Sequence, residues 1–178
     1  EIVVNQLPEA TIPAGGPTTF CDGGSVTLTA SEGSSYLWST GAITRAITVS
    51  ASGNYSVTVT DANGCSAISA PVSVIVNPLP TATISAVGET TFCDGESVTL
   101  TASEGTSYSW STGADTRAIT VSASGSYSVT VTDANGCSAT SAPVSVIVNS
   151  LPTAGNISGE GKNFEKGNAD VTVHRQHN

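Results

Sequence analysis

The feature that most constrains this chain is an internal repeat. The stretch SGNYSVTVTDANGC at residues 52–65 returns as SGSYSVTVTDANGC at residues 124–137. Equivalent residues are 72 positions apart, the difference between Cys93 and Cys21. A unit of that length buries only a modest core, and such small domains usually need a further stabilising element such as a disulfide. We therefore expect two small domains built to one design.

The repeated stretch has the pattern of a β-strand that ends in a tight turn. Tyr55, Val57 and Val59 alternate with Ser and Thr, which gives one apolar and one hydroxylated face. Gly53 stands two positions before Tyr55, as at a tyrosine corner, where the ring packs inward and its hydroxyl bonds a neighbouring backbone group. The dipeptide at residues 63–64, Asn-Gly, predicts a two-residue hairpin turn with positive φ at both residues.

Composition and strand spacing predict the fold class. Only 11% of the residues are charged, Ser, Thr and Gly are abundant, and no stretch has convincing helical periodicity. In the first repeat the strand patterns lie at residues 10–12, 25–30, 36–38, 46–49, 55–60 and 71–77. Six or seven short strands with turn signals between them describe an antiparallel sandwich. We predict an all-β chain of tandem antiparallel β-sandwiches, with about seven short strands each.

Proline-containing linkers mark the borders between units. A Leu-Pro pair occurs at residues 7–8, 79–80 and 151–152, and proline keeps such linkers extended and fairly stiff. The predicted units are residues 1–5 as the closing strand of a preceding repeat, 6–77 as repeat 1, 78–149 as repeat 2, and 150–178 as the opening strands of a divergent third unit plus tail.

Differences between the two copies indicate which side chains face inward. Leu37 in repeat 1 is Ser109 in repeat 2, an exchange that a solvent-facing position accepts cheaply. Because successive strand residues point to opposite faces, an outward Leu37 places Tyr36 and Trp38 inward. The predicted core aromatics are Trp38, Tyr55, Trp110 and Tyr127.

The four cysteines fall as two equivalent pairs, and we expect one disulfide within each repeat, Cys21–Cys65 and Cys93–Cys137. Two alternatives remain open: reduced, buried cysteines, or a Cys65–Cys93 bridge across the linker. A zinc site is disfavoured because the repeats contain no histidine and no CxxC spacing. Paired cysteines point to an oxidising compartment outside the cytoplasm.

The charge and motif patterns argue against several functions. A net charge of −9 disfavours nucleic acid and anionic membrane surfaces, and no apolar run reaches the length needed for membrane insertion. No nucleophile–base set or phosphate-binding loop is present, so we predict no enzyme and no cofactor.

One pair of oxygen-bearing residues in each repeat is a candidate for weak calcium binding. These are Asp61 with Asn63 and Asp133 with Asn135. Calcium needs more oxygen ligands than two, so the alternative is turn chemistry, with Asp61 capping its own loop and Asn63 in the left-handed position. We assign no metal site.

The motifs SVTLTA, YLWSTG and SGNYSVTVTDANGC resemble the immunoglobulin-like and PKD-like repeats found in tandem in very large surface proteins of Bacteroidetes. The resemblance covers both full repeats. It implies an immunoglobulin-like sandwich, secretion (often by the type IX route), and a role in adhesion, gliding or the cell-surface layer. One departure from antibody-type domains is that the places of the inter-sheet disulfide are Ala30 and Val57, or Ala102 and Val129.

These observations lead to one leading hypothesis and two alternatives. The leading one is a structural spacer in an extracellular, cell-surface stalk or filament that supports adhesion, with neighbouring repeats of the same or an adjacent chain as partners. The first alternative is a module that binds a surface glycan or protein through the end loops 32–35 and 43–45. The second is a filament subunit that assembles by strand addition through residues 1–5 and 164–173.

Overall fold

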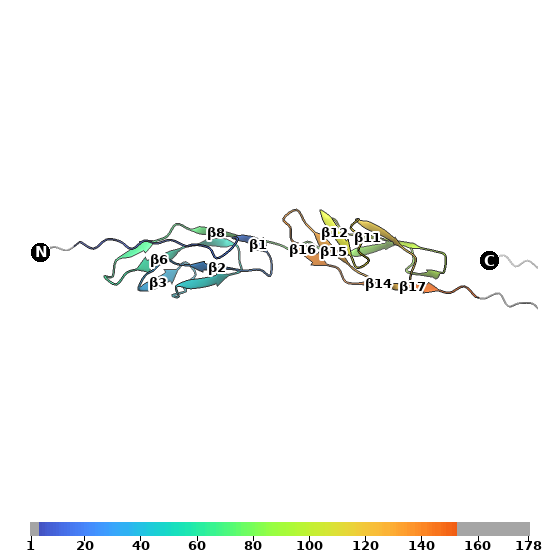
Figure 1. Cartoon of the computed structure of the whole chain (residues 1–178), viewed down its shortest axis with the longest axis horizontal. Helices are drawn as coiled ribbons and strands as arrows, with labels where there is room; N and C mark the ends of the chain where they lie inside the picture. Colours follow the sequence, from blue (N-terminus) through green and yellow to red (C-terminus); the bar gives the residue numbers. More distant parts are fainter. Residues whose placement is uncertain (1–3, 153–178) are drawn as a thin grey trace, which may run out of the picture.

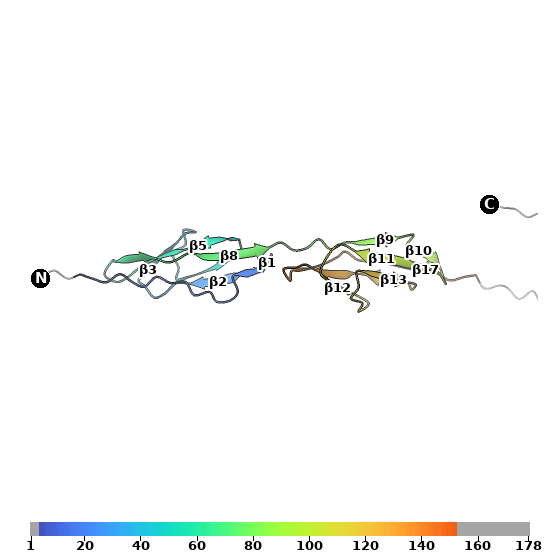
Figure 2. The ribbon, with the colours of Figure 1, turned by 90° about the horizontal axis from the view of Figure 1, so that it is seen from above.

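The computed structural model describes residues 4–152, and within that range the chain is all-β. Two β-sandwiches follow one another end to end, and the linker between them runs along the long axis of the molecule (Figures 1 and 2). No helix in this range could cross a membrane. The predicted fold class is confirmed. Residues 1–3 and 153–178, with most of the predicted third unit, lie outside the described residues.

Repeat 1 contains eight short strand segments. They are β1 (Thr19–Cys21), β2 (Val26–Thr29), β3 (Ser35–Trp38), β4 (Ala46–Val49), β5 (Gly53–Tyr55), β6 (Val57–Thr60), β7 (Ser66–Ile68) and β8 (Val72–Asn77).

Repeat 2 has the same eight, preceded by one more. They are β9 (Ile84–Val87), β10 (Thr91–Cys93), β11 (Val98–Ala102), β12 (Ser107–Trp110), β13 (Ala118–Val121), β14 (Gly125–Tyr127), β15 (Val129–Thr132), β16 (Ser138–Thr140) and β17 (Val144–Asn149).

The strands of each repeat form two layers. In repeat 1, β2 pairs with β4 in one layer, while the other layer combines the orders β3-β6-β7 and β1-β8-β5. β5 and β6 are consecutive parts of one extended segment, as are β7 and β8, so these two groups continue into each other. β1 runs parallel to β8, with Thr19 opposite Ile75 and Cys21 opposite Asn77. The sandwich is therefore antiparallel except for this one pair in each repeat.

A β-bulge separates the two halves of the long hairpin. Thr58 lies opposite Ile68, whereas Tyr55 lies opposite Val72, so the register shifts by one residue around Pro71. The shift suits a proline, which has no N–H for a strand ladder. Ser69 is buried at the bulge, where its Oγ accepts a hydrogen bond from the Val57 N–H at 3.1 Å.

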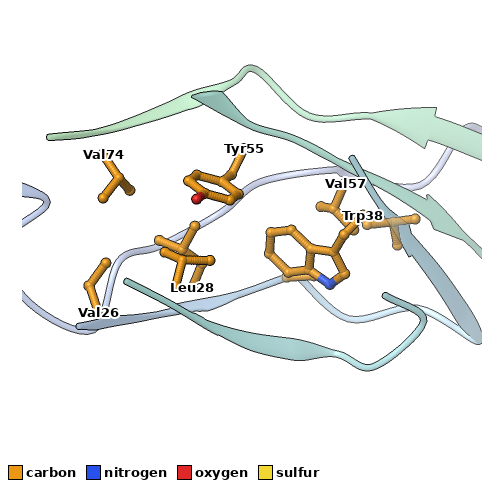
Figure 3. Packing of buried hydrophobic residues seen from close by; sticks show 9 residues of the cluster. Val26, Leu28, Trp38, Tyr55, Val57 and Val74 are labelled. Carbon is orange, nitrogen blue, oxygen red and sulfur yellow. The ribbon is translucent and has the colours of Figure 1, made fainter. Parts of the chain in front are cut away.

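The core of repeat 1 lies between the layers, where Trp38, Tyr55 and Leu28 point toward one another (Figure 3). Trp38 packs beside Val57 rather than against a disulfide, and its Nε1 donates to the carbonyl of Thr44 at 2.8 Å. The equivalent residues of repeat 2 form the same cluster.

The four core aromatics are all buried. Trp38 and Trp110 are 2% and 3% exposed, and Tyr55 and Tyr127 are 9% and 8% exposed. As at a tyrosine corner, the Tyr55 hydroxyl donates to the carbonyl of Ala51 at 2.9 Å. The preceding Gly53 lies against the edge of the same ring.

Two local predictions are wrong. Residues 10–12 form no strand, and the first segment of repeat 1 touches the β2–β4 layer only through a bridge between Ala14 and Leu28. The hairpin turn is also longer than two residues: Gly64 alone has a positive φ, of 82°, and Asn63 does not. Asp61 and Cys65 close a three-residue loop, because Asp61 N donates to Cys65 O at 2.9 Å.

Candidate functional site at the junction of the repeats

A disulfide crosses the junction between the two repeats. Cys21 is bonded to Cys137, 116 positions further along the chain, with their Cα atoms 5.5 Å apart. Cys65 and Cys93 are free. The predicted pairs within each repeat, Cys21–Cys65 and Cys93–Cys137, are therefore wrong, and so is the alternative Cys65–Cys93 bridge.

The reason is that the two cysteines of one repeat lie at opposite ends of its sandwich. Cys21 is aligned with Asn77, the last residue of β8, whereas Cys65 immediately precedes β7. The extended β7–β8 segment between them spans about 12 residues, or on the order of 40 Å at the usual rise per residue. A disulfide needs Cα atoms within about 7 Å, so the pair cannot close within one repeat.

On the side of repeat 1, the backbone around Cys21 is held by its neighbours. Asp22 N donates to the carbonyl of Asn77 at 2.8 Å, which extends the β1–β8 pairing past the cysteine. Gly24 N donates to the carbonyl of Cys21 at 2.9 Å and turns the chain back toward β2. The cysteine is thus fixed at the end of the sandwich by two strands and a turn.

On the side of repeat 2, the turn between β15 and β16 presents Cys137. The Asp133 Oδ1 atom accepts hydrogen bonds from Asn135 N at 2.8 Å and Cys137 N at 2.9 Å, so one carboxylate holds both ends of the loop. Asp133 N donates to Cys137 O at 2.9 Å and closes it. Cys137 is fully buried in the junction.

These turns are also where the candidate calcium ligands lie. In repeat 1, Asp61 Oδ1 accepts from Asn63 N at 2.8 Å and Cys65 N at 2.9 Å. The carboxylate therefore caps its own loop, as the alternative to calcium binding predicts, but Asn63 does not adopt the left-handed conformation that this alternative also predicts. Residues 4–152 contain no group of three or more His, Cys, Asp or Glu side chains placed to hold a metal ion.

The end loops that were candidates for ligand binding do come together. An Arg45 guanidinium nitrogen lies 3.6 Å from a Glu32 carboxylate oxygen, and Arg117 and Glu104 repeat the pair at the same distance. Both partners are well exposed, so each pair contributes little to stability. The described part of the chain has no pocket beside these loops or elsewhere.

The fold and the junction together define a tandem pair of β-sandwiches joined by one peptide linker and one disulfide. No protein-family profile matches the sequence, and no curated protein matches it. Solved structures similar to the chain include three that align with at most 21% identity and a TM-score of at most 0.41.

Three N-terminal domains of the highly immunogenic outer capsid protein (Hoc) of bacteriophage RB49 align with 21% identity and a TM-score of 0.41, over 78% of this chain and 58% of that one. Murine CEACAM1b aligns at 14% and 0.37, over 79% of this chain and all of that one. Fibronectin(III)-like modules of Clostridium thermocellum CbhA align at 16% and 0.39, over 78% and 94%. The chain thus spans little more than half of the Hoc structure.

Proposed function

We propose that these repeats are spacer modules in an extended extracellular stalk on a bacterial surface, where they hold an adhesive or other functional domain away from the cell. The observation that carries the proposal is the junction, where a disulfide adds a second connection beside the linker. Even a stiff linker leaves a single point about which the sandwiches can rotate, whereas two connections at separate points restrict bending between them.

Three further observations support this function. The sandwiches are arranged end to end, so each repeat adds its full length (Figure 1). A disulfide suits an oxidising compartment outside the cytoplasm. The strand motifs resemble those of tandem repeats in large surface proteins of Bacteroidetes.

Small-angle X-ray scattering of matched variants tests this proposal. The control variant Cys65→Ser/Cys93→Ser keeps the junction disulfide and has no free thiol. The test variant also carries Cys21→Ser and Cys137→Ser. We expect an elongated particle for the control and a broader range of inter-repeat distances for the test variant, while tryptophan fluorescence shows both repeats still folded.

Two outcomes contradict the proposal. One is a compact control particle in which the repeats fold back side by side. The other is indistinguishable scattering from the two variants, which would mean that the disulfide does not restrict the junction.

A further inference from the structure

The cysteines that are free in this chain are the repeat equivalents of the two that are bonded. Cys93 is the counterpart of Cys21, and Cys65 is the counterpart of Cys137. The internal disulfide therefore joins the earlier cysteine of repeat 1 to the later cysteine of repeat 2. At each outer end of the pair of repeats lies a free cysteine that is equivalent to one of the two bonded cysteines at the junction.

The end that carries Cys93 has the backbone arrangement of its bonded counterpart. Cys93 ends β10 and lies opposite Asn149, the last residue of β17. Asp94 N donates to the carbonyl of Asn149 at 2.8 Å, the same distance as the equivalent bond beside Cys21. A second sandwich placed here would meet the surface that repeat 2 meets at the internal junction.

The end that carries Cys65 likewise has the backbone arrangement of its bonded counterpart, the loop that carries Cys137. The Asp61 carboxylate holds Cys65 N at 2.9 Å, as Asp133 holds Cys137 N at 2.9 Å. The loop that presents the thiol is thus formed before any bond is made. This loop is the part that a preceding sandwich would contact.

Burial differs between the internal joint and the outer ends. Cys137 is fully buried and Cys21 half-buried, whereas Cys65 is half-buried and Cys93 exposed. Asn77 at the joint is half-buried, while Asn149 at the outer end is exposed. The outer ends are thus more exposed than the internal junction, and neither free cysteine is buried.

We propose that Cys93 of one copy of this chain forms a disulfide with Cys65 of a second copy, so that the internal joint is repeated from copy to copy. The contact joins two different surfaces, one from each end, and is therefore heterologous. A heterologous contact that does not close into a ring continues as an open filament. A further repeat of the same kind on one longer polypeptide would present the same chemistry.

The bond forms by thiol–disulfide exchange with a small disulfide such as oxidised glutathione. The Cys93 thiolate attacks the glutathione disulfide, releases one glutathione and forms a mixed disulfide. The Cys65 thiolate of the second copy then attacks the Cys93 sulfur and releases the second glutathione. The two cysteines lose two electrons, one glutathione disulfide gains them, and the two thiol protons end on the two glutathiones.

The test mixes two single variants, each with one usable end. Cys65→Ser retains Cys93, and Cys93→Ser retains Cys65, while both keep the internal Cys21–Cys137 pair. One variant is labelled with ¹⁵N, and the two are mixed in equal amounts with oxidised glutathione. Intact-mass spectrometry then separates the heterodimer from the two homodimers, and peptide mapping identifies the bridges.

We expect the heterodimer to exceed the two homodimers together by about fivefold, because only unlike ends are complementary. The unmutated chain should form a ladder of oligomers that a reductant collapses to monomer. Equal amounts of heterodimer and total homodimer, as random pairing of accessible thiols gives, would overturn the proposal. So would the absence of a Cys65–Cys93 peptide between copies.

The proposed joining of copies rests on the junction used in the proposed function. The results that contradict the two proposals can nevertheless be distinguished. If peptide mapping finds no internal Cys21–Cys137 bridge, the spacer proposal and the inference both lose their basis. If that bridge is present and the heterodimer is not favoured, only the joining of copies is wrong.

Discussion

The two repeats have nearly the same core but differ along one edge of the sandwich. In repeat 2, β9 pairs with β11 over four residue pairs, from Thr99–Val87 to Ala102–Ile84. In repeat 1 the equivalent segment makes one isolated bridge and no strand. The chain still follows a similar path there, because Gly15 N donates to Thr27 O at 2.9 Å.

Two substitutions account for the difference. Ser85 and Val87 of β9 correspond to Pro13 and Gly15 in repeat 1. Proline has no N–H for the ladder, and glycine weakens a strand because it loses more entropy on ordering and offers no side chain to pack. Repeat 1 therefore has a less regular edge, of the kind that discourages pairing with another chain. The edge varies between the copies while the core stays constant.

The largest expected effect is the loss of stability when a core leucine is truncated. Comparing this loss between the repeats tests whether their cores are equivalent. Leu28 and Leu100 are both fully buried, so changing either to Ala should lower the free energy of unfolding of its own repeat by about 2–5 kcal/mol. Urea unfolding followed by peptide-resolved hydrogen exchange reports each repeat separately. The control is Leu37→Ala, at a position 54% exposed, where we expect less than about 0.5 kcal/mol. A clearly smaller loss at Leu28 would show that the cores differ as well.

A second prediction concerns a close approach that both repeats share. A Cβ atom added at Gly33 would overlap the Cγ1 atom of buried Val59, and Gly105 stands in the same relation to Val131. Gly33→Ala and Gly105→Ala should each cost about 1–3 kcal/mol in the free energy of unfolding, measured in urea. Gly16→Ala is the matched control, because nothing lies within 4 Å of its added Cβ. Equal effects at Gly33 and Gly16 would contradict the expected overlap.

The third prediction exchanges the edges of the two repeats. Pro13→Ser with Gly15→Val should stabilise repeat 1 by about 1 kcal/mol, because it restores a ladder donor and a strand-forming residue. The reverse exchange, Ser85→Pro with Val87→Gly, should destabilise repeat 2 by a similar amount. Hydrogen exchange at Thr29, whose N–H donates to Pro13 O, and at the equivalent Thr101 measures the protection of each edge. If the first exchange gives no added protection, the loss of the strand has a cause outside these two residues.

The smallest expected effect concerns a charge found at only one of the two equivalent ends. Glu96 occupies the place of Gly24, and its carboxylate accepts a hydrogen bond from Cys93 N at 3.1 Å. In the proposed contact between copies, the opposing end would contribute Asp61, so the two carboxylates would repel each other. Glu96→Gln should raise the initial rate of cross-linking between copies by about twofold at low salt, and added salt should remove the gain.

The control for this measurement is Glu104→Gln, which removes one charge at the opposite end of repeat 2, where Glu104 pairs with Arg117. An equal acceleration by this variant would mean that net charge, rather than the carboxylate beside the thiol, controls the rate.

Much of the core was predictable from the sequence because alternation along a strand directly determines which side chains face inward. The pattern at Tyr55 and Val57 and the outward Leu37 were enough to place Trp38 in the core, and all the residues concerned lie as expected. The turn was less predictable. Asn-Gly is compatible with several loops, and the loop length depended on the Asp61 carboxylate, which accepts two backbone N–H groups.

To predict the pairing of the cysteines, one would need to know the direction of every strand between them. Four strand patterns separate Cys21 from Cys65, and strictly alternating passes would return the chain to the same end. Instead β3 and β4 run in the same direction, because the loop at residues 39–45 crosses back without forming a strand. Two cysteines within one repeat thus end up far apart. The 72-residue period makes Cys137 the equivalent of Cys65, and only the strand directions show that it lies at the end of the second sandwich that faces Cys21.

The Cys21–Cys137 bond also determines how the molecule carries mechanical tension. When the two ends are pulled, force passes from Cys21 directly to Cys137, and the residues between them form a closed loop outside the load path. That loop of about 115 residues would otherwise add on the order of 400 Å of contour length on unfolding. With the disulfide intact, a pulled chain can release only its outer segments, so the molecule resists lengthening even after hydrogen bonds in the sandwiches have broken.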